Sequence, residues 1–224
     1  MLKRGPVRGA LHNCQVMPNR RIDPDVVRWS QAPQGGRPLL VLLHGRGADE
    51  VDLQGLVPYL PQEVVVASIR APIAEGPGFS WYPMGVAPGG APREEDVDAA
   101  VQAVLEWLDL LPSVSSIGLL GFSQGGAMAI QLLRYRPRAF TYAVVLSGFV
   151  IAGARPGDGE LAQLRPPIFW GRGTFDPVIS ELRIEQTASW LPEHSTLTAR
   201  TYSTAHSIVD QELADVSAFI TSRL

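Results

Sequence analysis

Residues 118–126 read GLLGFSQGG, an apolar run that leads directly into a serine flanked by glycines. The pattern G-x-S-x-G, here from Gly121 to Gly125, is typical of a sharp turn between a strand and a helix that exposes the serine hydroxyl as a nucleophile. Such a short match is weak alone, because glycine and serine are common residues. The question is whether Ser123 lies at the end of a strand and whether a base and an acid accompany it.

Apolar runs that end at turn residues recur along the chain. They predict strands over residues 39–45, 63–72, 116–122, 142–148, 166–171 and 195–202, with further edge strands within residues 11–16 and 25–33. The first five runs are nearly continuous in apolar residues, which is typical of parallel strands covered by helices on both faces. The run that ends at Phe122 directly precedes Ser123, as a strand-to-helix turn requires.

Amphipathic stretches lie between these runs. Residues 93–112 repeat apolar positions with helical spacing, carry acidic residues in the first turn and end at Pro112. Residues 207–224 show the same period, and residues 125–137 are apolar on most sides, which indicates a buried helix. Two glycine- and proline-rich stretches, 71–92 and 147–160, are expected as loops that carry a binding surface, too short for a multi-helix lid. We therefore expect an α/β fold with a doubly wound, mostly parallel sheet.

Length and composition are those of one globular domain. The chain has 224 residues, 46% of them hydrophobic and 18% charged, and a net charge of -3. We assign residues 1–224 to a single domain, with residues 1–37 as an N-terminal segment. A small negative charge with scattered basic residues gives no electrostatic basis for binding nucleic acid or an anionic membrane.

Targeting and redox signals are sparse. The N-terminus has basic residues but no apolar run of signal-peptide length, and the longest apolar stretch, residues 142–154, is too short to span a bilayer. We expect a cytoplasmic protein with no stable membrane association. Cys14 is the one cysteine, so the chain can form neither an internal disulfide nor a zinc site of several cysteines.

Three polar residues follow predicted strands: Ser123, Asp176 and His206. Residues beyond the carboxyl ends of parallel strands share one edge of the sheet, so these side chains can meet there. A serine hydroxyl is a poor nucleophile at neutral pH and needs a base, which in turn needs a carboxylate to hold its tautomer. The chain order serine, aspartate, histidine is that of α/β-hydrolases, and we predict a catalytic triad.

Other acids and bases are less well placed. His194 precedes its strand and should lie at the opposite edge, His12 lies in the N-terminal segment, and His44 lies within HGRG. Asp158 could replace Asp176 only if the sheet ended one strand earlier. The last predicted helix contains two further aspartates, Asp210 and Asp215.

Acyl transfer also needs two backbone N–H donors for the oxyanion. Gln124, the residue after the serine, supplies one. We expect the second from Arg46 in LLHGRGADE, where Gly45 and Gly47 allow the backbone to turn the amide inward. The alternative is a plain glycine turn capped by Asp49 at the next helix. Neither donor depends on its side chain.

Four features resemble the phospholipase/carboxylesterase family of α/β-hydrolases, which includes acyl-protein thioesterases and small bacterial carboxylesterases: HGRGAD, GFSQGG, DPVI, and a histidine followed by an amphipathic helix. The resemblance runs from about Pro38 to the C-terminus. It implies the α/β-hydrolase fold and a serine esterase without metal or cofactor that cleaves carboxylic esters or thioesters through an acyl-enzyme. It also implies Ser123, Asp176 and His206 as the triad, with Arg46 and Gln124 as oxyanion donors.

Two positions depart from the family pattern. Ala205 stands where members commonly have glycine before the catalytic histidine, and alanine is tolerated there if its φ is negative. WYPMG stands where members often have W-[FY]-D, which changes the substrate loop. We expect an open apolar groove that favours short to medium acyl chains. Its predicted lining is Trp81, Met84, Phe149, Val150 and Ile151; the alternative is that these residues pack against the core.

Rival functions share most of these features. A thioesterase, a peptidase or an arylesterase would need the same triad and donors and would differ only in its pockets. A non-catalytic relative that binds a small ligand or a protein has the same fold, although such proteins usually lose a triad member. The expected partner is a small-molecule ester or thioester. The sequence leaves both a monomer and a homodimer open.

Overall fold

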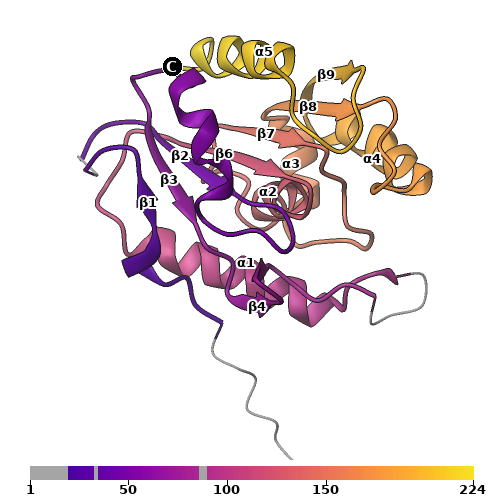
Figure 1. The fold of residues 1–224 in the computed structure, drawn as a ribbon, viewed down its shortest axis with the longest axis horizontal. Coiled ribbons are helices and arrows are strands. Elements are labelled where there is room, and N and C mark those ends of the chain that lie inside the picture. The colour runs from indigo at the N-terminus through magenta and orange to yellow at the C-terminus, as the bar shows by residue number, and fades with distance from the viewer. Residues whose placement is uncertain (1–19, 33–34, 86–89) are drawn as a thin grey trace, which may run out of the picture.

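The structure is a computed structural model that describes residues 20–32, 35–85 and 90–224 (Figure 1). His12, Cys14 and the edge strand expected within residues 11–16 lie outside the described residues. Among the residues that the structure describes, no helix combines the length and the apolar character needed to cross a membrane.

A seven-stranded sheet lies at the centre, with strand order β1-β3-β2-β6-β7-β8-β9 (Figure 1). Its strands are β1 (Arg28–Trp29), β2 (Leu39–Leu43), β3 (Val65–Ile69), β6 (Ile117–Phe122), β7 (Tyr142–Leu146), β8 (Pro167–Gly173) and β9 (Thr196–Tyr202). Neighbouring strands are parallel except β1, which pairs antiparallel with β3. The predicted mostly parallel α/β fold is confirmed.

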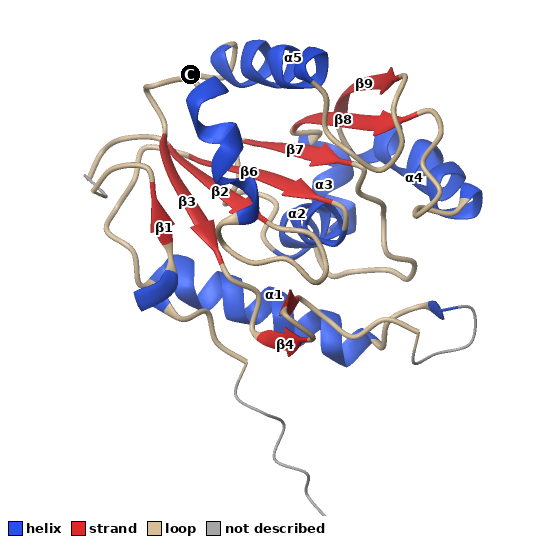
Figure 2. Ribbon diagram, in the orientation of Figure 1, coloured by secondary structure: helices blue, strands red, loops and turns tan. Residues whose placement is uncertain are grey.

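Helices cover both faces of the sheet (Figure 2). One face carries α1 (Glu94–Asp109), α2 (Gln124–Tyr135), α3 (Asp158–Leu164) and α4 (Glu181–His194). The other carries the 3₁₀ helix η2 (Asp52–Tyr59) and α5 (Asp210–Thr221). A short 3₁₀ turn, η1 (Pro24–Val26), precedes β1.

Alternate residues of each strand point to opposite faces and divide the apolar interior into two clusters. In β2, Leu39, Val41 and Leu43 belong to the cluster under α1 and α2, whereas Leu40 and Leu42 pack toward η2 and α5. All five are at most 2% exposed. The central strands read as continuous apolar runs because both of their faces are buried.

Two stretches expected as loops contain regular structure. Residues 71–92 hold a hairpin of β4 (Ile73–Glu75) and β5 (Gly78–Ser80), and residues 147–160 contain the start of α3. The hairpin strands are too short to show a period in the sequence. Phe79 of β5 also forms a bridge with Ala48, so the hairpin lies against the segment that follows β2.

Candidate active site

The order of the strands reverses between β2 and β6, which are neighbours in the sheet. The chain leaves β2 for β3 on one side and continues from β6 to β7 on the other, which opens a crevice beyond the carboxyl ends of β2 and β6. Ser123 follows β6, and Gly45 follows β2. A Cβ placed on Gly45 would lie 3.7 Å from the Cβ of Ser123, so the two loops are in contact in this crevice.

Ser123 occupies a strained turn between β6 and α2. Its φ is 55° and its ψ is -115°, a conformation that costs a non-glycine residue roughly 1–3 kcal/mol. The Ser123 N–H donates to the Leu146 carbonyl at 2.8 Å. Gly121 lies so close to the Gly125 carbonyl that any Cβ there would collide with it. These contacts hold the backbone of Ser123 in the shape of a nucleophile elbow.

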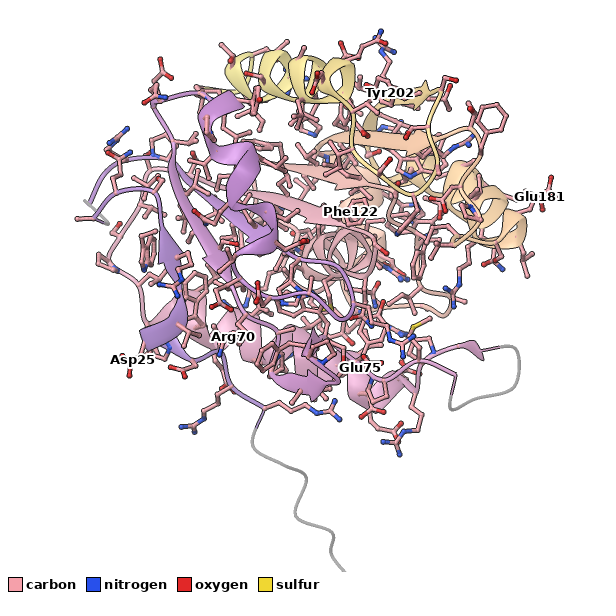
Figure 3. All side chains as sticks on the ribbon, in the orientation of Figure 1. Asp25, Arg70, Glu75, Phe122, Glu181 and Tyr202 are labelled. Carbon is pink, nitrogen blue, oxygen red and sulfur yellow. The ribbon has the colours of Figure 1, made fainter. Side chains whose placement is uncertain are left out.

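Asp176 and His206 meet beside this turn. The Nδ1 of His206 lies 2.7 Å from the Oδ2 of Asp176, and the two side chains are 16% and 2% exposed respectively. The His206 ring also packs on Phe122, with ring centroids 4.8 Å apart. Phe122 is the last residue of β6 and is labelled at the centre of Figure 3. The histidine ring therefore packs on the residue that precedes Ser123, while no hydrogen bond joins the Ser123 Oγ to His206 among the described residues.

Hydrogen bonds hold both oxygens of the Asp176 carboxylate. Oδ1 accepts from the N–H groups of Val178 and Ile179 at 2.8 and 3.1 Å, while Oδ2 faces His206. Burial raises the pKa of Asp176, but the hydrogen bonds from His206 and from the two amides outweigh burial and hold this pKa below its usual range. The carboxylate therefore stays charged at neutral pH and keeps the His206 proton on Nδ1. Nε2 is left to accept a proton.

The loops that carry the acid and the histidine are joined through their backbones. Two hydrogen bonds of 2.9 and 3.1 Å run from Thr174 to Tyr202 and from Phe175 to Thr204. Ala205 is not among the described non-glycine residues that have a positive φ. The alanine that departs from the family pattern thus needs no strained backbone.

Two backbone N–H groups beside Ser123, those of Arg46 and Gln124, donate to no acceptor among the described residues. The next amide along the first loop is used, since the Gly47 N–H donates to the Phe79 carbonyl at 2.8 Å. The two unused donors come from opposite sides of the crevice, one from each loop. They are the residues that the sequence predicts as oxyanion donors.

The Arg46 side chain has a separate partner. Its Nε donates to Oε1 of Glu75 at 2.7 Å, and Glu75, which ends β4, is labelled below Phe122 in Figure 3. Asp49 caps the following turn, because its carboxylate accepts from the Val51 N–H at 2.9 Å. This cap is the one that the alternative interpretation expects, and it leaves the Arg46 amide unused.

His44 is fully buried behind the same loop. Its Nε2 accepts from the Ala71 N–H at 3.0 Å, which means that this nitrogen carries no proton. Nδ1 therefore carries the proton and donates to the Gly45 carbonyl at 2.7 Å. Burial is the main cause that holds the pKa of His44 below its usual range. His44 is a neutral histidine that shapes the loop.

The other acidic and basic candidates lie away from Ser123. His194 ends α4 and stacks on a tryptophan of the same helix, with ring centroids 3.9 Å apart. Asp158 begins α3 and pairs with Arg134, whose Nε lies 2.7 Å from its Oδ1. Asp210 and Asp215 lie in α5.

The predicted substrate-binding residues are mostly buried. Trp81, Phe149, Val150 and Ile151 are 0%, 3%, 6% and 7% exposed and belong to one apolar cluster, against which Met84 packs. A side chain without exposed surface offers nothing to a ligand in this conformation, and Trp81 is such a side chain. Val150 and Ile151 also line a surface hollow of about 550 Å³, whose described lining includes no residue of the predicted triad.

Exposed apolar side chains that sequence reasoning missed lie close to Asp176 in the chain. Phe175, Val178 and Leu182 are 71%, 59% and 62% exposed. They belong to the loop after β8 and the first turn of α4. Phenylalanine, valine and leucine are not catalytic residue types, and a loop has no regular spacing from which exposed positions could be predicted. We call these three residues the apolar rim.

The fold is the α/β-hydrolase fold, because solved structures with that fold match this chain over most of its length. The structure of the Bacillus cereus carboxylesterase has a TM-score of 0.76 at 22% sequence identity, over 88% of this chain and 94% of that one. The structure of Zea mays acyl-protein thioesterase 2 has a TM-score of 0.70 at 21% identity, over 88% and 98%. At these identities the similarity shows the fold alone.

The sequence places the chain more closely within that class. The phospholipase/carboxylesterase family matches residues 26–224, and the chain belongs to this family. The acyl-protein thioesterase 1 of Debaryomyces hansenii is 35% identical over 104 residues, which are 45% of this chain and 45% of that protein. The matched part is thus less than half of that relative. The family resemblance inferred from the motifs is confirmed.

Proposed function

We propose that this protein is a serine hydrolase that cleaves carboxylic esters of short to medium acyl chains through an acyl-enzyme on Ser123. The main support is the 2.7 Å contact between His206 and Asp176 beside a serine with a φ of 55°. An imidazole held by a carboxylate next to a serine is what general-base activation of a hydroxyl needs. The placement of Ser123, Asp176 and His206 after strands of one sheet supports this assignment.

In the proposed reaction, the Ser123 Oγ attacks the ester carbonyl carbon while the Nε2 of His206 takes the hydroxyl proton. The Asp176 carboxylate stabilises the imidazolium that forms. His206 then gives the proton to the leaving alcohol oxygen, the carbon–oxygen bond breaks, and the acyl group stays on Ser123. Water then attacks the acyl carbon while His206 takes its proton, and His206 returns this proton to the Ser123 Oγ as the bond between Oγ and the acyl carbon breaks and the carboxylic acid leaves.

The oxyanion of each tetrahedral intermediate would accept from the N–H groups of Arg46 and Gln124. Neither amide donates to a described residue. A donor already in place costs no reorganisation as charge develops, and one such donor is worth roughly 10²- to 10³-fold in rate. The Arg46 guanidinium has no part in this step, because it is paired with Glu75.

The apolar rim is the surface that we propose for the acyl chain. Phe175 precedes the acid of the triad, and its side chain is 71% exposed. Each methylene that such a surface buries contributes up to about 0.8 kcal/mol. A chain that extends past the rim returns to water and gains nothing more, so the preference should end at medium length.

A thioester is the second candidate substrate. The observation that favours it is the match to an acyl-protein thioesterase 1. The same serine, base and donors would serve, since a thioester differs from an ester only in its leaving atom. The two candidates differ in kcat/KM for substrates that share one acyl group.

Labelling with a fluorophosphonate tests the proposed function. We expect labelling of the wild type and none of Ser123→Ala. Ser147→Ala is the matched control, because Ser147 is also a serine with a positive φ, 46°, directly after a strand. It should keep its label. A panel of ester, thioester and amide with one acyl group then identifies the bond. A wild type that is neither labelled nor active on the panel would be a non-catalytic binding protein.

A further inference from the structure

The Gln124 side chain is 3% exposed, and both ends of its amide bind the backbone of a distant segment. Oε1 accepts from the Trp81 N–H at 2.9 Å, and Nε2 donates to the Tyr82 carbonyl at 2.8 Å. The partners fix which end is oxygen, because an N–H can only donate and a carbonyl can only accept. Gln124 therefore ties the start of α2 to the segment that follows β5.

Trp81 continues this connection to the loop that follows β2. Its indole Nε1 donates to the His44 carbonyl at 2.9 Å, and its ring lies 5.4 Å from the His44 ring, centroid to centroid. The His44 carbonyl belongs to the peptide that leads into Gly45 and Arg46. His44 is held in turn by the hydrogen bonds of its own ring to Ala71 and Gly45.

We propose that the Gln124 side chain is a positioning residue, which sets the distance between the two oxyanion donors by joining them through Trp81. One donor is the N–H of Gln124 itself, and the other is the N–H of Arg46. They lie on different loops that no hydrogen bond among the described residues joins directly. Both loops bind the segment around Trp81, through this path and through the hydrogen bonds of Phe79 with Gly47 and Ala48. This inference rests on the proposed function, because it assigns a role in the same acyl transfer.

The chemistry of the position explains why an amide is needed. Glutamine offers a donor and an acceptor at one end, which is what the adjacent N–H and C=O groups of residues 81 and 82 require. Methionine has nearly the same length and shape but leaves both backbone groups without a partner. Buried polar groups without partners are unfavourable, so the segment would shift to find others and move Trp81 with it.

The test compares Gln124→Met with the wild type on p-nitrophenyl acetate. A donor displaced by a fraction of an ångström stabilises the transition state less but leaves the bound ester unaffected. We expect kcat to fall roughly 10- to 100-fold and KM to stay within about threefold. The inhibition constant of a trifluoromethyl ketone, which forms a tetrahedral adduct on the serine, should rise by the same factor as kcat/KM falls.

Gln131→Met is the matched control. Gln131 lies in the same helix, is 0% exposed, and accepts from Arg134 at 2.8 Å. This variant also loses a buried amide, yet it leaves both donors untouched. Its kcat should stay within about twofold of the wild type, since loss of stability alone does not change the rate per folded molecule.

Trp81→Phe keeps the test decisive if Gln124→Met does not fold. It removes the hydrogen bond to the His44 carbonyl and retains a ring in the core. We expect a smaller loss of kcat, roughly 3- to 10-fold, with the same parallel change in the ketone inhibition constant.

Three outcomes separate the two proposals. Equal losses of kcat and ketone affinity in Gln124→Met or Trp81→Phe, with Gln131→Met unchanged, support the inference. A folded Gln124→Met with wild-type kcat, or a Gln131→Met that loses as much, overturns the positioning role and leaves the esterase proposal intact. A wild type that hydrolyses no ester and forms no ketone adduct overturns both.

Discussion

The two sides of Ser123 differ in solvent exposure. We call the loop after β2 the β2 flank, and the loops after β8 and β9, which carry Asp176 and His206, the β9 flank. On the β2 flank, the loop after the strand is enclosed by His44, Trp81 and Gln124, which are 0%, 0% and 3% exposed. On the β9 flank, the His206 side chain is 16% exposed, and Phe175 beside its acid is 71% exposed. The strands repeat the contrast, since β2 is buried at every residue and β9 is buried only at its last.

Each flank suits the task that we propose for it. Backbone donors stabilise an oxyanion only if they are already in place and shielded from water. A base must take up a proton, give it to a leaving group and admit water, so it needs some access to solvent. The molecule places one histidine on each flank. Burial keeps His44 neutral and fixed, whereas His206 lies at the surface with a carboxylate behind it.

The largest expected loss of activity comes from replacing the three proposed catalytic side chains, two of which lie on the β9 flank. Ser123→Ala, His206→Ala and Asp176→Asn should each lower kcat by roughly 10³-fold or more, and double variants should lose little more, because the three act as a unit. Circular dichroism checks that each variant is folded. Asp158→Asn is the control. If Asp176→Asn retained activity and Asp158→Asn lost it, the acid would be wrongly assigned and the contrast between the flanks would fail.

The next effect tests the β2 flank through its backbone. Arg46→Pro removes an N–H and should lower kcat by roughly 10²-fold or more if the loop still folds. Arg46→Ala keeps the amide and should stay within about tenfold of the wild type. Glu75→Gln weakens the same ion pair from the other side and serves as the matched control. A folded, fully active Arg46→Pro would remove this residue from the oxyanion site.

Glu212 is a buried acidic residue on the otherwise exposed β9 flank. It lies in the first turn of α5 and is 2% exposed. Its Oε1 packs against Gly171 of β8 and has no hydrogen-bond partner among the described residues. Burial raises the pKa of Glu212 from 4.5 to about 7, opposed by the Val209 N–H and assisted by Asp215.

This raised pKa predicts that the protein loses stability as the pH rises from 4.5 to about 7. Between pH 4.5 and about 7, the folded chain holds a proton that the unfolded chain has released, so the free energy of unfolding falls as pH rises through this window. The loss approaches a ceiling of about 3 kcal/mol. Glu212→Gln should remove it, so that urea unfolding finds the variant more stable at pH 8.5 and equal to the wild type at pH 4.5. The exposed Glu185→Gln is the control, and a variant with the wild-type pH slope would contradict the assignment.

The two flanks also differ in how far the sequence predicts them. The strands and the order of Ser123, Asp176 and His206 follow from apolar runs with both faces buried, and from the rule that residues after parallel strands share an edge. The hydrogen bond between His206 and Asp176 needs only that rule and two short loops. Arg46 as a donor was expected from Gly45 and Gly47 in a loop after a strand, and a plain glycine turn remained as the alternative, because a backbone amide carries no residue signature.

What the sequence missed depends on contacts between distant segments. The partners of the Gln124 side chain lie 43 and 42 residues earlier in the chain, beyond the reach of any local pattern. Trp81 was expected as a substrate contact because it lies in a glycine-rich stretch, yet its side chain is 0% exposed. Trp81 directly follows β5, and the hairpin strands β4 and β5 are too short for their period to be recognised.

The smallest expected change in kcat/KM comes from a substitution in the apolar rim, on the exposed β9 flank. If the apolar rim binds the acyl chain, polar substitution there should weaken long substrates selectively. Leu182→Ser should lower kcat/KM on p-nitrophenyl octanoate about fivefold, which corresponds to roughly 1 kcal/mol of lost apolar contact, and leave p-nitrophenyl acetate unchanged. Leu110→Ser is the matched control, because Leu110 is 85% exposed at the end of α1.

The dependence of kcat/KM on acyl chain length provides the second measurement. In the wild type, kcat/KM should peak at short to medium chains, since an open rim leaves the rest of a longer chain in water. Equal values for Leu182→Ser and the wild type on octanoate would remove the apolar rim from acyl binding. A steady rise in kcat/KM to sixteen carbons would place the acyl chain in a closed channel and contradict an open site on this flank.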